Sequence, residues 1–576
     1  MFLQLKFPAR TLEVSEVVSR FSRTPLFWVI CAILLIFVAA GVGLYACFSP
    51  GFLSVEPHDE YRLVLGAEYV NVPVIVEEKD VLVPVEAVKK YLDPTLFWEP
   101  GDGRLTVTTK DRVMQMNTDQ LTAYINRREI QLDVPVTERN GNPYMPLLLF
   151  EDFYDIQVEV HHHTRVVVID RVEIPYMRAA AGRAVAVRTQ PSFRAPRVVT
   201  LEPDEFVRVF RDDGGWYHLR TEGGQLGYAH KMSIQITGAD VVKAPEKEPE
   251  RKSPWKPMGE RICLVWEHVV NENPLPETLR PMPGVNVVSP TWFSLRDEEG
   301  NLNNRADPAY VQWAHEQGYQ VWALVSNSFD RDLSAAVLRV GEKRQKIIDQ
   351  LLAFSELYHL DGINVDFENM YLEDRDYFTQ FMREFAPLAR EQGLVLSVDV
   401  TIKSSSEHWS RIYDRRALAE IVDYVMLMAY DEHWGTSPVA GSVASLPWVE
   451  RGLRGVLEEV PPEKLLLGVP FYTRLWEIEH LEGGAENVSS RAYGMDRIHR
   501  ILQEHDAEIV FCEKTGQHYA NYHSQGKEYR VWLEDEESLA SRLKIVEQYN
   551  LAGVAAWRRG FESADIWALF EDKLNP

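Results

Sequence analysis

The chain has 576 residues, of which 45% are hydrophobic and 11% aromatic, so it is long enough for about three or four domains with sizeable cores. Its formal net charge of -25 argues against nucleic-acid binding, because a protein that binds a phosphate backbone needs a basic face. The four cysteines show neither CxxC nor Cys/His spacing, which makes a structural zinc site and a disulfide scaffold poor explanations of the fold.

Residues 25–48 form an uncharged apolar run that is long enough to cross about 30 Å of hydrocarbon at about 1.5 Å per residue. Basic residues in the tail 1–24 precede it, and acidic residues in 56–60 follow it. This asymmetry predicts a single transmembrane helix with a cytoplasmic N-terminus and everything after residue 48 outside, facing the cell wall. An alternative is lipidation of Cys47, since Leu44 to Cys47 loosely resembles a lipoprotein processing box, and either route tethers the chain outside.

An internal repeat lies in residues 60–172, where VPVEAV at 83–88 aligns with MPLLLF at 145–150. Each copy has a proline where a helix is expected to begin, a position at which proline loses no hydrogen bond. The segment resembles the N-terminal domain of copper amine oxidases. This resemblance implies a stalk, either a spacer or a wall-binding module, without oxidase activity. The run His161 to His163 is interpreted as a solvated loop rather than a metal site.

Five short strands separated by Gly-rich turns are expected over residues 180–238. The pattern around GGWYHLRTEGGQLGYAH resembles a bacterial Src-homology-3-like domain, a module that often binds cell-wall peptides or glycans in that family. Trp216 is either a half-buried packing residue or part of such a binding surface. Residues 239–258 contain four prolines among mixed charges, which predicts a semi-rigid linker.

From about residue 260 the chain alternates strand-like and helix-like runs, and several strands are near-continuous Val, Ile and Leu, as in buried parallel sheets. Eight such units predict a TIM barrel over residues 259–576, with helices such as 344–358 and 373–392 between strands. Cys263 and Cys512 are expected as separate buried thiols, with a disulfide between them as the alternative. The expected strands span 262–266, 285–289, 320–325, 362–367, 395–400, 422–428, 465–469 and 553–557.

The strand around DGINVDFE, residues 361–368, carries the chemistry. Side chains alternate along a strand, so Asn364, Asp366 and Glu368 are expected to point into the barrel while the apolar residues between them point to the helices. Two carboxylates on one inward face are costly unless they share a proton. Coupling to Asp366 and partial burial should raise the pKa of Glu368 and keep it protonated near neutral pH, as a general acid requires.

These residues resemble the DGxDxDxE signature of glycoside hydrolase family 18, the chitinase-like family, with Asn364 in place of the first Asp of its DxDxE core. The change removes a charge that would normally modulate Asp366. The resemblance implies substrate-assisted catalysis, in which the substrate's acetamido group attacks the anomeric carbon. Glu368 would protonate the leaving oxygen and then activate water, while Asp366 would orient the acetamido group and stabilise the oxazolinium ion.

Further residues match the family at other strand ends. Tyr430 and Asp431 would hold the acetamido carbonyl and the sugar, and Trp557 would form the stacking floor beneath the sugar. Tyr472, Trp292 and Asn364 are the remaining candidate substrate-binding residues. Residues of about 477–545 resemble the α+β insertion that walls one side of the cleft in this family.

The sequence therefore predicts a retaining glycosidase that cuts β-1,4 bonds at N-acetylglucosamine in peptidoglycan or chitin-type oligosaccharides. No cofactor and no metal are expected, and the partners are this polysaccharide and the membrane. The alternatives are a non-catalytic glycan-binding envelope protein and a purely structural adaptor. Retention of Glu368 argues against the first alternative, because chitinase-like lectins typically lose this residue.

Overall fold

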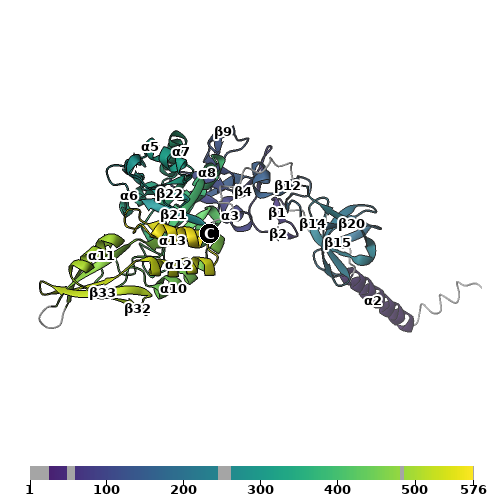
Figure 1. Cartoon of the computed structure of the whole chain (residues 1–576). Coiled ribbons are helices and arrows are strands. Elements are labelled where there is room, and N and C mark those ends of the chain that lie inside the picture. The colour runs from purple at the N-terminus through teal and green to yellow at the C-terminus, as the bar shows by residue number, and fades with distance from the viewer. Residues whose placement is uncertain (1–24, 49–58, 244–260, 481–485, 575–576) are drawn as a thin grey trace, which may run out of the picture. The chain divides into compact units, whose positions relative to one another are not determined.

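The computed structural model describes residues 25–48, 59–243, 261–480 and 486–574 (Figure 1). The chain forms two compact units. The first comprises Met1–Leu92 with Arg139–Lys247, and the second comprises Asp93–Glu138 with Glu248–Pro576. The predicted cytoplasmic tail 1–24 and the predicted linker from residue 244 onward lie outside the described residues.

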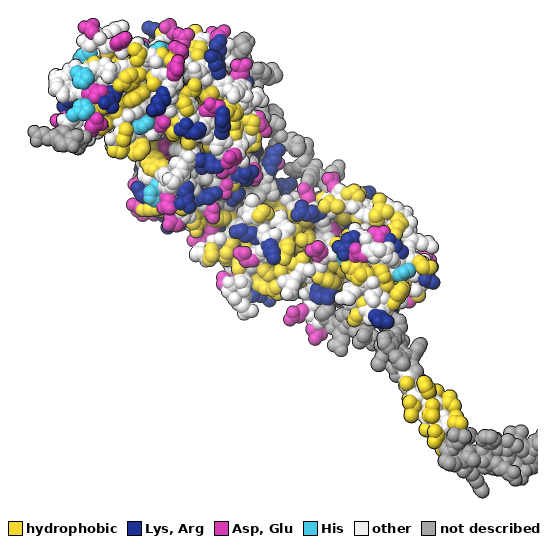
Figure 2. All heavy atoms as spheres, turned by 90° about the horizontal axis from the view of Figure 1, so that it is seen from below, with side chains coloured by type: hydrophobic (Ala, Val, Ile, Leu, Met, Phe, Trp, Pro, Cys, Tyr) yellow, Lys and Arg dark blue, Asp and Glu magenta, His cyan; other side chains and the backbone are white. Residues whose placement is uncertain are grey.

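The apolar run at the N-terminus forms helix α2, Pro25–Phe48. Hydrophobic side chains such as Trp28, Leu35 and Phe37 are exposed along it (Figure 2). Measured over the described residues, the chain contains no helix that meets the combined length and hydropathy needed to span a membrane.

The two copies of the internal repeat pair with each other in the first unit. Strands β4 (Val81–Pro84) and β11 (Asn142–Pro146) are antiparallel, with Val83 opposite Met145. The helix expected after each proline forms as α3, Val85–Tyr91, in the first copy. The second copy forms only a 3-10 turn, Leu148–Phe150, and the four-residue α4, Glu151–Tyr154. The other strands are β1 (Arg62–Leu65), β2 (Glu68–Val70), β3 (Ile75–Val76), β10 (Thr137–Arg139), β12 (Ile156–His161) and β13 (Val166–Arg171).

A seven-stranded antiparallel sheet completes the first unit, in the order β16-β15-β19-β18-β17-β14-β20. It contains two strands more than the five expected, because the sheet begins earlier, at Pro175, and ends later, at Val241. Trp216 is largely buried, and the exposed Phe193 packs on it with ring centroids 4.8 Å apart. The strands are β14 (Pro175–Ala181), β15 (Val185–Arg188), β16 (Arg197–Leu201), β17 (Phe206–Asp213), β18 (Trp216–Thr221), β19 (Leu226–His230) and β20 (Ile234–Val241).

The second unit contains the predicted barrel, and its eight parallel strands are confirmed. Each strand pairs with the next around a closed ring, which the β22–β25 and β21–β35 pairings complete. The strands are β21 (Ile262–Glu267), β22 (Val287–Pro290), β25 (Gln320–Ser326), β26 (Gly362–Asp366), β27 (Val395–Thr401), β28 (Tyr424–Met428), β29 (Leu465–Pro470) and β35 (Gly553–Trp557). Their helices are α5 (Pro308–Glu316), α6 (Arg331–Leu338), α7 (Gly341–Tyr358), α8 (Arg375–Glu391), α9 (Arg415–Ile421), α10 (Leu446–Leu457), α12 (Glu536–Gln548) and α13 (Ile566–Leu574).

Two apolar clusters show the expected alternation of side chains along the barrel strands. Residues such as Ile363 and Val365 belong to the large cluster between the strands and the helices. Residues such as Trp266, Trp322 and Met426 form a smaller cluster inside the ring. The barrel interior is therefore a packed core, and polar side chains near its upper rim stand on a rigid floor.

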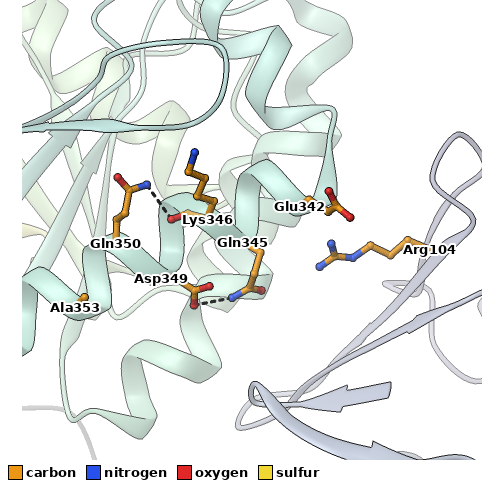
Figure 3. Close-up of a pocket in the computed structure, with 7 residues that line it drawn as sticks. All are labelled: Arg104, Glu342, Gln345, Lys346, Asp349, Gln350 and Ala353. Carbon is orange, nitrogen blue, oxygen red and sulfur yellow. Dashed lines mark hydrogen bonds between the residues drawn. The ribbon is translucent and has the colours of Figure 1, made fainter. Parts of the chain in front are cut away.

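The middle of the segment expected to form a stalk belongs to the barrel unit. Its five-stranded sheet comprises β5 (Phe97–Glu99), β6 (Arg104–Thr108), β7 (Val113–Asn117), β8 (Thr122–Ile125) and β9 (Arg128–Gln131). Val113 joins the large barrel cluster, and the ring of Phe97 meets that of Tyr377 edge-on at 5.8 Å. Along this seam lies an open groove of about 440 Å³, with Arg104 of β6 on one side and residues of α7 on the other (Figure 3). The groove is lined by Arg104, Glu342, Gln345, Lys346, Asp349, Gln350 and Ala353 and by none of the predicted catalytic residues.

The insertion forms a five-stranded sheet with helix α11 (Met495–Glu504). The end predicted near residue 545 is too late, since Leu539 and Leu543 of α12 pack in the barrel core. Cys263 is buried, Cys512 is half-buried, and both are free thiols. The insertion strands are β30 (Tyr472–His480), β31 (Glu486–Gly494), β32 (Ile509–Cys512), β33 (Gln517–Ser524) and β34 (Lys527–Trp532).

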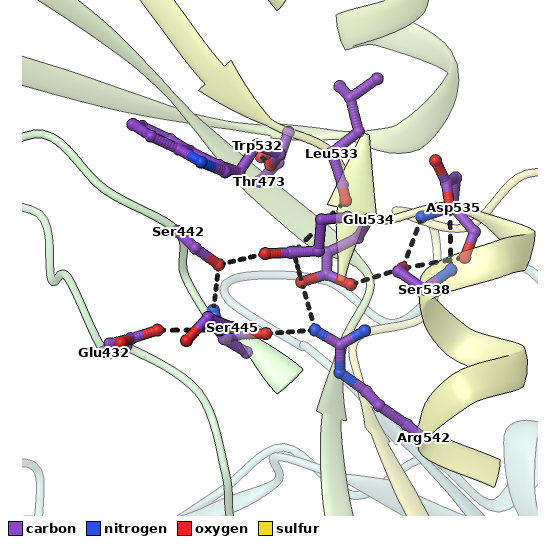
Figure 4. Close-up of polar contacts among 12 residues, drawn as sticks. Glu432, Ser442, Ser445, Thr473, Trp532, Leu533, Glu534, Asp535, Ser538 and Arg542 are labelled. Carbon is purple, nitrogen blue, oxygen red and sulfur yellow. Dashed lines mark hydrogen bonds and ion pairs between the residues drawn. The ribbon is translucent and has the colours of Figure 1, made fainter. Parts of the chain in front are cut away.

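A buried ion pair joins the insertion to the barrel (Figure 4). Arg542 of α12 donates to Glu534 Oε1 at 2.9 Å, and Gln517 of β33 donates to the same oxygen at 2.8 Å. Ser538 donates to Glu534 Oε2 at 2.8 Å, so both carboxylate oxygens are satisfied. The pairing of both carboxylate oxygens with groups of β33 and α12 fixes where the insertion sits on the barrel, while Arg542 Nε and Nη1 are buried without a partner among the described residues.

Candidate active site

Strand β26 ends at Asp366, and the two residues that follow it are clamped by their backbone. Asn327, just after β25, accepts a hydrogen bond from Glu368 N at 3.0 Å and donates to Glu368 O at 2.6 Å. The Tyr413 hydroxyl donates to Phe367 O at 2.9 Å. Phe367 itself is fully buried in the cluster between strands and helices. Glu368 is therefore fixed at the carboxyl end of a barrel strand, the edge at which TIM-barrel enzymes place their chemistry.

Asn364 lies below the acids, and it is fully buried. Its side-chain oxygen accepts hydrogen bonds from Trp266 Nε1 at 2.9 Å and Ser289 Oγ at 3.3 Å. Its amide nitrogen donates to Asp399 Oδ1 at 2.8 Å. The prediction that Asn364 binds substrate is therefore wrong, because a side chain without exposed surface holds other protein groups instead of a sugar.

Asp366 and Glu368 form a coupled pair of partly buried acids. Burial raises the pKa of Asp366 to about 7. The pKa of Glu368 lies well above its ordinary value, first because of burial and then because of the negative charges of Asp366, Asp399 and Asp431. Asp366 Oδ1 is buried without a hydrogen-bond partner within the described residues. The arrangement keeps a proton on Glu368 near neutral pH and leaves Asp366 an oxygen that can accept a hydrogen bond from a ligand.

Tyr430 and Asp431 follow β28, on the far side of Asp399 from β26. Burial first, and then the nearby Asp399, raise the pKa of Tyr430 well above its ordinary value, so its hydroxyl remains a proton donor. Asp431 is exposed, and its Oδ1 accepts from the Tyr472 hydroxyl at 2.7 Å and from Arg474 at 3.2 Å. Tyr472 is only 5% exposed, so it orients Asp431 more than it offers a surface to substrate.

Trp557 closes the barrel at the end of β35. Its half-buried ring lies against Trp266, with centroids 6.0 Å apart, and against His268 at 5.7 Å. Part of the ring packs on the inner barrel cluster. An aromatic ring anchored on one side and open on the other suits the apolar C–H face of a sugar.

The sugar contact expected for Trp292 is contradicted by its position. The side chain is 0% exposed and belongs to the cluster between strands and helices. Its indole N–H donates to Asn273 Oδ1 at 2.6 Å, and its ring meets that of Tyr310 edge-on at 5.6 Å. A ring without exposed surface cannot stack on a sugar.

Sequence reasoning missed two charged residues of the site. Asp399 lies on β27, where Val395 joins the inner cluster and the odd-numbered residues share its inward face. This two-residue period was the signal that could have identified it, as it did for Asp366. Arg474, on the first insertion strand, gave no such signal because its role depends on a long-range contact with Asp431.

The site thus combines a proton donor of raised pKa, a second acid with an unpaired oxygen, a phenol and an aromatic floor. No group of three or more residues suited to hold a metal occurs in the part of the chain that the structure describes. Proton donation beside a carboxylate, next to a surface suited to a sugar, is the equipment of glycoside hydrolysis.

Comparison with protein families agrees with this geometry. Residues 312–562 match the glycosyl hydrolases family 18, residues 64–169 match the copper amine oxidase N-terminal domain, and residues 183–235 match the bacterial SH3 domain. These matches confirm all three resemblances stated from the sequence. Each match lies inside the range expected for the corresponding domain.

The chain is also similar to individual curated proteins and to solved structures. The chain is 26% identical over 295 residues to the uncharacterized glycosylase YvbX of Bacillus subtilis (strain 168), covering 49% of this chain and 83% of that one. It is 27% identical over 259 residues to a cortical fragment-lytic enzyme of the same organism, covering 44% of this chain and 58% of the relative. A chitinase-like C-terminal domain from Desulfitobacterium hafniense DCB-2 shares the fold, with 24% identity and a TM-score of 0.50 over 55% of this chain and 99% of that one.

The acids at the rim, the barrel that holds them and the family match lead to one assignment: residues 312–562 form a glycosyl hydrolases family 18 domain, which follows a copper amine oxidase N-terminal domain and a bacterial SH3 domain in the sequence, and the chain is a glycosidase.

Proposed function

We propose that this glycosidase cuts β-1,4 bonds at N-acetylglucosamine units with retention of configuration, by substrate-assisted catalysis. The observation that carries the proposal is the pair formed by Asp366 and Glu368. Glu368 holds a proton because of burial and neighbouring charge. Asp366 presents a buried oxygen without a partner, which an acetamido N–H fits. Because the acetamido group acts as nucleophile, no carboxylate need stand on the opposite face of the sugar.

The reaction begins with the 2-acetamido group of the bound sugar. Its carbonyl oxygen attacks the anomeric carbon while the bond from that carbon to the glycosidic oxygen breaks. Glu368 transfers its proton to the departing oxygen, and Asp366 accepts a hydrogen bond from the acetamido N–H and balances the positive oxazolinium ion. Tyr430 donates its hydroxyl hydrogen to the acetamido oxygen, which holds that oxygen in line for attack.

Glu368 is now ionised and acts as the base. It takes a proton from water, the water oxygen bonds to the anomeric carbon, and the bond from that carbon to the acetamido oxygen breaks. Two inversions at the same carbon give net retention. Trp557 supports the sugar ring in both steps, and Asp431, held by Tyr472, accepts a hydrogen bond from a sugar hydroxyl.

We propose peptidoglycan as the substrate class. Two observations support it over chitin-type oligosaccharides. One matched relative is named as a cortical fragment-lytic enzyme, and the chain carries a bacterial SH3 domain as an accessory module. A substrate of this kind lies outside the cytoplasmic membrane. The charge-free run at 25–48, with basic residues before it and acidic residues after it, supports an enzyme that is anchored in the cytoplasmic membrane and faces outward.

The catalytic proposal is tested with purified full-length protein, defined muropeptides and chitooligosaccharides. Released products are identified by mass spectrometry, and their initial anomeric form is followed by proton NMR. Wild type should release products as the β-anomer, and E368Q should lose at least about 100-fold in kcat, since it cannot donate a proton. The matched control is E504Q, at an exposed position on α11, which should keep wild-type rates.

Three results would contradict the proposal in different ways. Equal rates for wild type and E368Q remove Glu368 from its role, and initial release of the α-anomer removes retention. Tight glycan binding without turnover by the wild type favours the alternative of a non-catalytic binding protein. Location is tested separately by fractionating cells and digesting intact protoplasts with protease, and a full-length chain found soluble without detergent would exclude the tether.

A further inference from the structure

Asp399 is a buried acid that the reaction described above does not use. It lies on β27, next to the strand that carries Asp366 and Glu368, and only 1% of its surface is exposed. Removing a carboxylate from water is costly unless a cation or several hydrogen bonds compensate it. The one hydrogen bond found for Asp399 within the described residues comes from the amide of Asn364, and no Lys, Arg or His there forms an ion pair with it. So costly a group at the floor of the site calls for a reason.

The orientation of Asn364 shows that its contact with Asp399 is fixed. The Asn364 oxygen is occupied by two donors, Trp266 Nε1 and Ser289 Oγ. Only its amide nitrogen is left to face β27, so Asn364 can donate to Asp399 but cannot accept from it. Asp399 Oδ1 therefore has a defined position, set by two neighbouring barrel strands and the ring of Trp266.

The groups that face Asp399 belong to the reaction. Asp366 and Glu368 approach from β26, and the Tyr430 phenol approaches from the end of β28. Tyr413, whose hydroxyl binds the backbone at Phe367, lies within electrostatic reach, with Arg415 behind its ring at 5.5 Å. Burial and the charge of Asp366 raise the pKa of Asp399 well above its ordinary value, and an ionised Asp399 in turn raises the pKa of Glu368. The three acids therefore do not all ionise near neutral pH, and Glu368 keeps its proton.

We propose that Asp399, oriented by Asn364, is a positioning residue for the acid pair, and that it supplies from the fifth strand the third acidic group, which Asn364 cannot supply from the fourth. This inference rests on the proposed function of Asp366 and Glu368. A role as a spacer between strands would not explain an acid at position 399, because an apolar pair of similar volume in place of Asn364 and Asp399 would fill the same space without the desolvation cost. The Asn–Asp pair has one more consequence. Its acid and its amide are interchangeable without loss of any hydrogen bond, since a carboxylate at 364 accepts from the same two donors.

The test compares D399N and the exchange variant N364D/D399N in the full-length protein. D399N keeps the size of the side chain and an oxygen for Asn364, and it removes the ionisable group. We expect kcat to fall at least about 10-fold with KM within about threefold. The alkaline limb of the kcat/KM profile should move to lower pH by about one unit, because a negative neighbour of Glu368 is lost. The exchange variant returns one acid to the pair and should recover kcat to within about threefold of wild type, with its alkaline limb restored.

Thermal melting establishes whether each variant is folded, and E368Q sets the floor of activity. If the wild-type protein were no more active than E368Q, the proposed function itself would be contradicted, and there would be no rate with which to compare the variants. With wild type above the floor, a folded D399N of unchanged kcat and pH profile overturns the role of Asp399. If D399N does not fold, the exchange variant decides. Near-wild-type turnover by it supports the proposal, and a folded exchange variant at the E368Q floor overturns it.

Discussion

Arg344 of α7 and Glu99 of β5 form a buried ion pair in which two guanidinium nitrogens lie 2.9 and 2.8 Å from the two carboxylate oxygens. Glu384 of α8 binds the other edge of the same guanidinium, at 3.0 and 2.8 Å. Arg344 and Glu384 are 0% exposed, and Glu99 is 5% exposed. A single arginine thus links the five-stranded sheet of residues 93–138 to two barrel helices with bidentate geometry.

Breaking this link should destabilise the enzyme. E99Q replaces one of the two carboxylates around the buried Arg344 with an uncharged amide. Breaking a buried ion pair in this way costs about 3–5 kcal/mol. The unfolding free energy, measured by urea denaturation, should fall by about this amount, while KM for the glycan stays within about twofold because no substrate contact changes. D102N, at an exposed position in the following turn, is the matched control and should leave stability unchanged. Equal stability of E99Q and wild type would show that the pair contributes nothing.

The same seam predicts the behaviour of truncated proteins. A protein that begins at residue 259 lacks β5–β9, so it exposes the ring of Tyr377 and the core surface that Val113 covers. It should be expressed largely as aggregate or melt well below the full-length chain. Supplying residues 93–138 ahead of the barrel through a flexible Gly/Ser linker should restore much of the melting temperature. A stable, active barrel from residue 259 alone would contradict this expectation.

The partly buried Asp366 should lower stability at alkaline pH. Its folded-state pKa is raised to about 7 from an ordinary 3.8, so the folded state binds the proton more tightly than the unfolded state. Such a group stabilises the fold fully below about pH 4, and this contribution is lost as the pH rises through about 7. D366N carries no such charge. Its melting temperature should exceed that of wild type by a few degrees at pH 8, and the difference should vanish near pH 4. D506N, at an exposed position after α11, should show no such crossing.

Tyr472 should act on binding through Asp431. Y472F removes the hydroxyl that donates to Asp431 Oδ1 at 2.7 Å, and Arg474 at 3.2 Å remains as its partner. The carboxylate then loses part of its orientation, and we expect KM to rise about three- to tenfold with a smaller change in kcat. Y549F, which removes a hydroxyl that binds Arg454 and Glu450 away from the acids, serves as control. A fall in kcat with unchanged KM would assign Tyr472 to the chemical step instead.

The two tryptophans of the site prediction should behave differently. W557A removes the half-buried ring at the end of β35 and should weaken oligosaccharide binding by about 1–2 kcal/mol, read by calorimetry with E368Q as the non-hydrolysing background. W292A removes a fully buried ring and should lower stability by about 3–5 kcal/mol. Where W292A still folds, it should bind the glycan as wild type does. Weaker binding by a folded W292A would return Trp292 to the cleft.

Much of the barrel follows from short-range patterns. Its strands are apolar runs bounded by polar turns, and the two-residue period placed Asp366 and Glu368 on the inward face. The same period did not decide Trp292, because an aromatic just past a strand end can turn either into the cleft or under the helices. The indole N–H of Trp292 donates to Asn273, which lies 19 positions away, and this contact holds the side chain in the core. Position along the chain carried no information about this choice.

Long-range ion pairs were beyond the sequence for a similar reason. Arg344 reads as one basic residue in an amphipathic helix, and Glu99 as one acid in a short strand 245 positions away. Neither has a local pattern that distinguishes a buried charge from a solvated one, since the distinction depends on which surface covers it. The resemblance to a known domain predicted one continuous stalk over residues 60–172. In the structure, packing assigns residues 93–138 to the barrel unit and the rest of that segment to the first unit.

That division has a consequence for the connectivity of the chain. The polypeptide passes from one unit to the other after Leu92, returns after Glu138, and passes over again after Lys247. A protease that cuts once between residues 244 and 260 would therefore release neither unit. The N-terminal fragment would still carry strands β5–β9, and Arg344 of the other fragment would still form its buried ion pair with Glu99 of β5. Nicked enzyme should run as two bands in denaturing gels and as one particle in native ones.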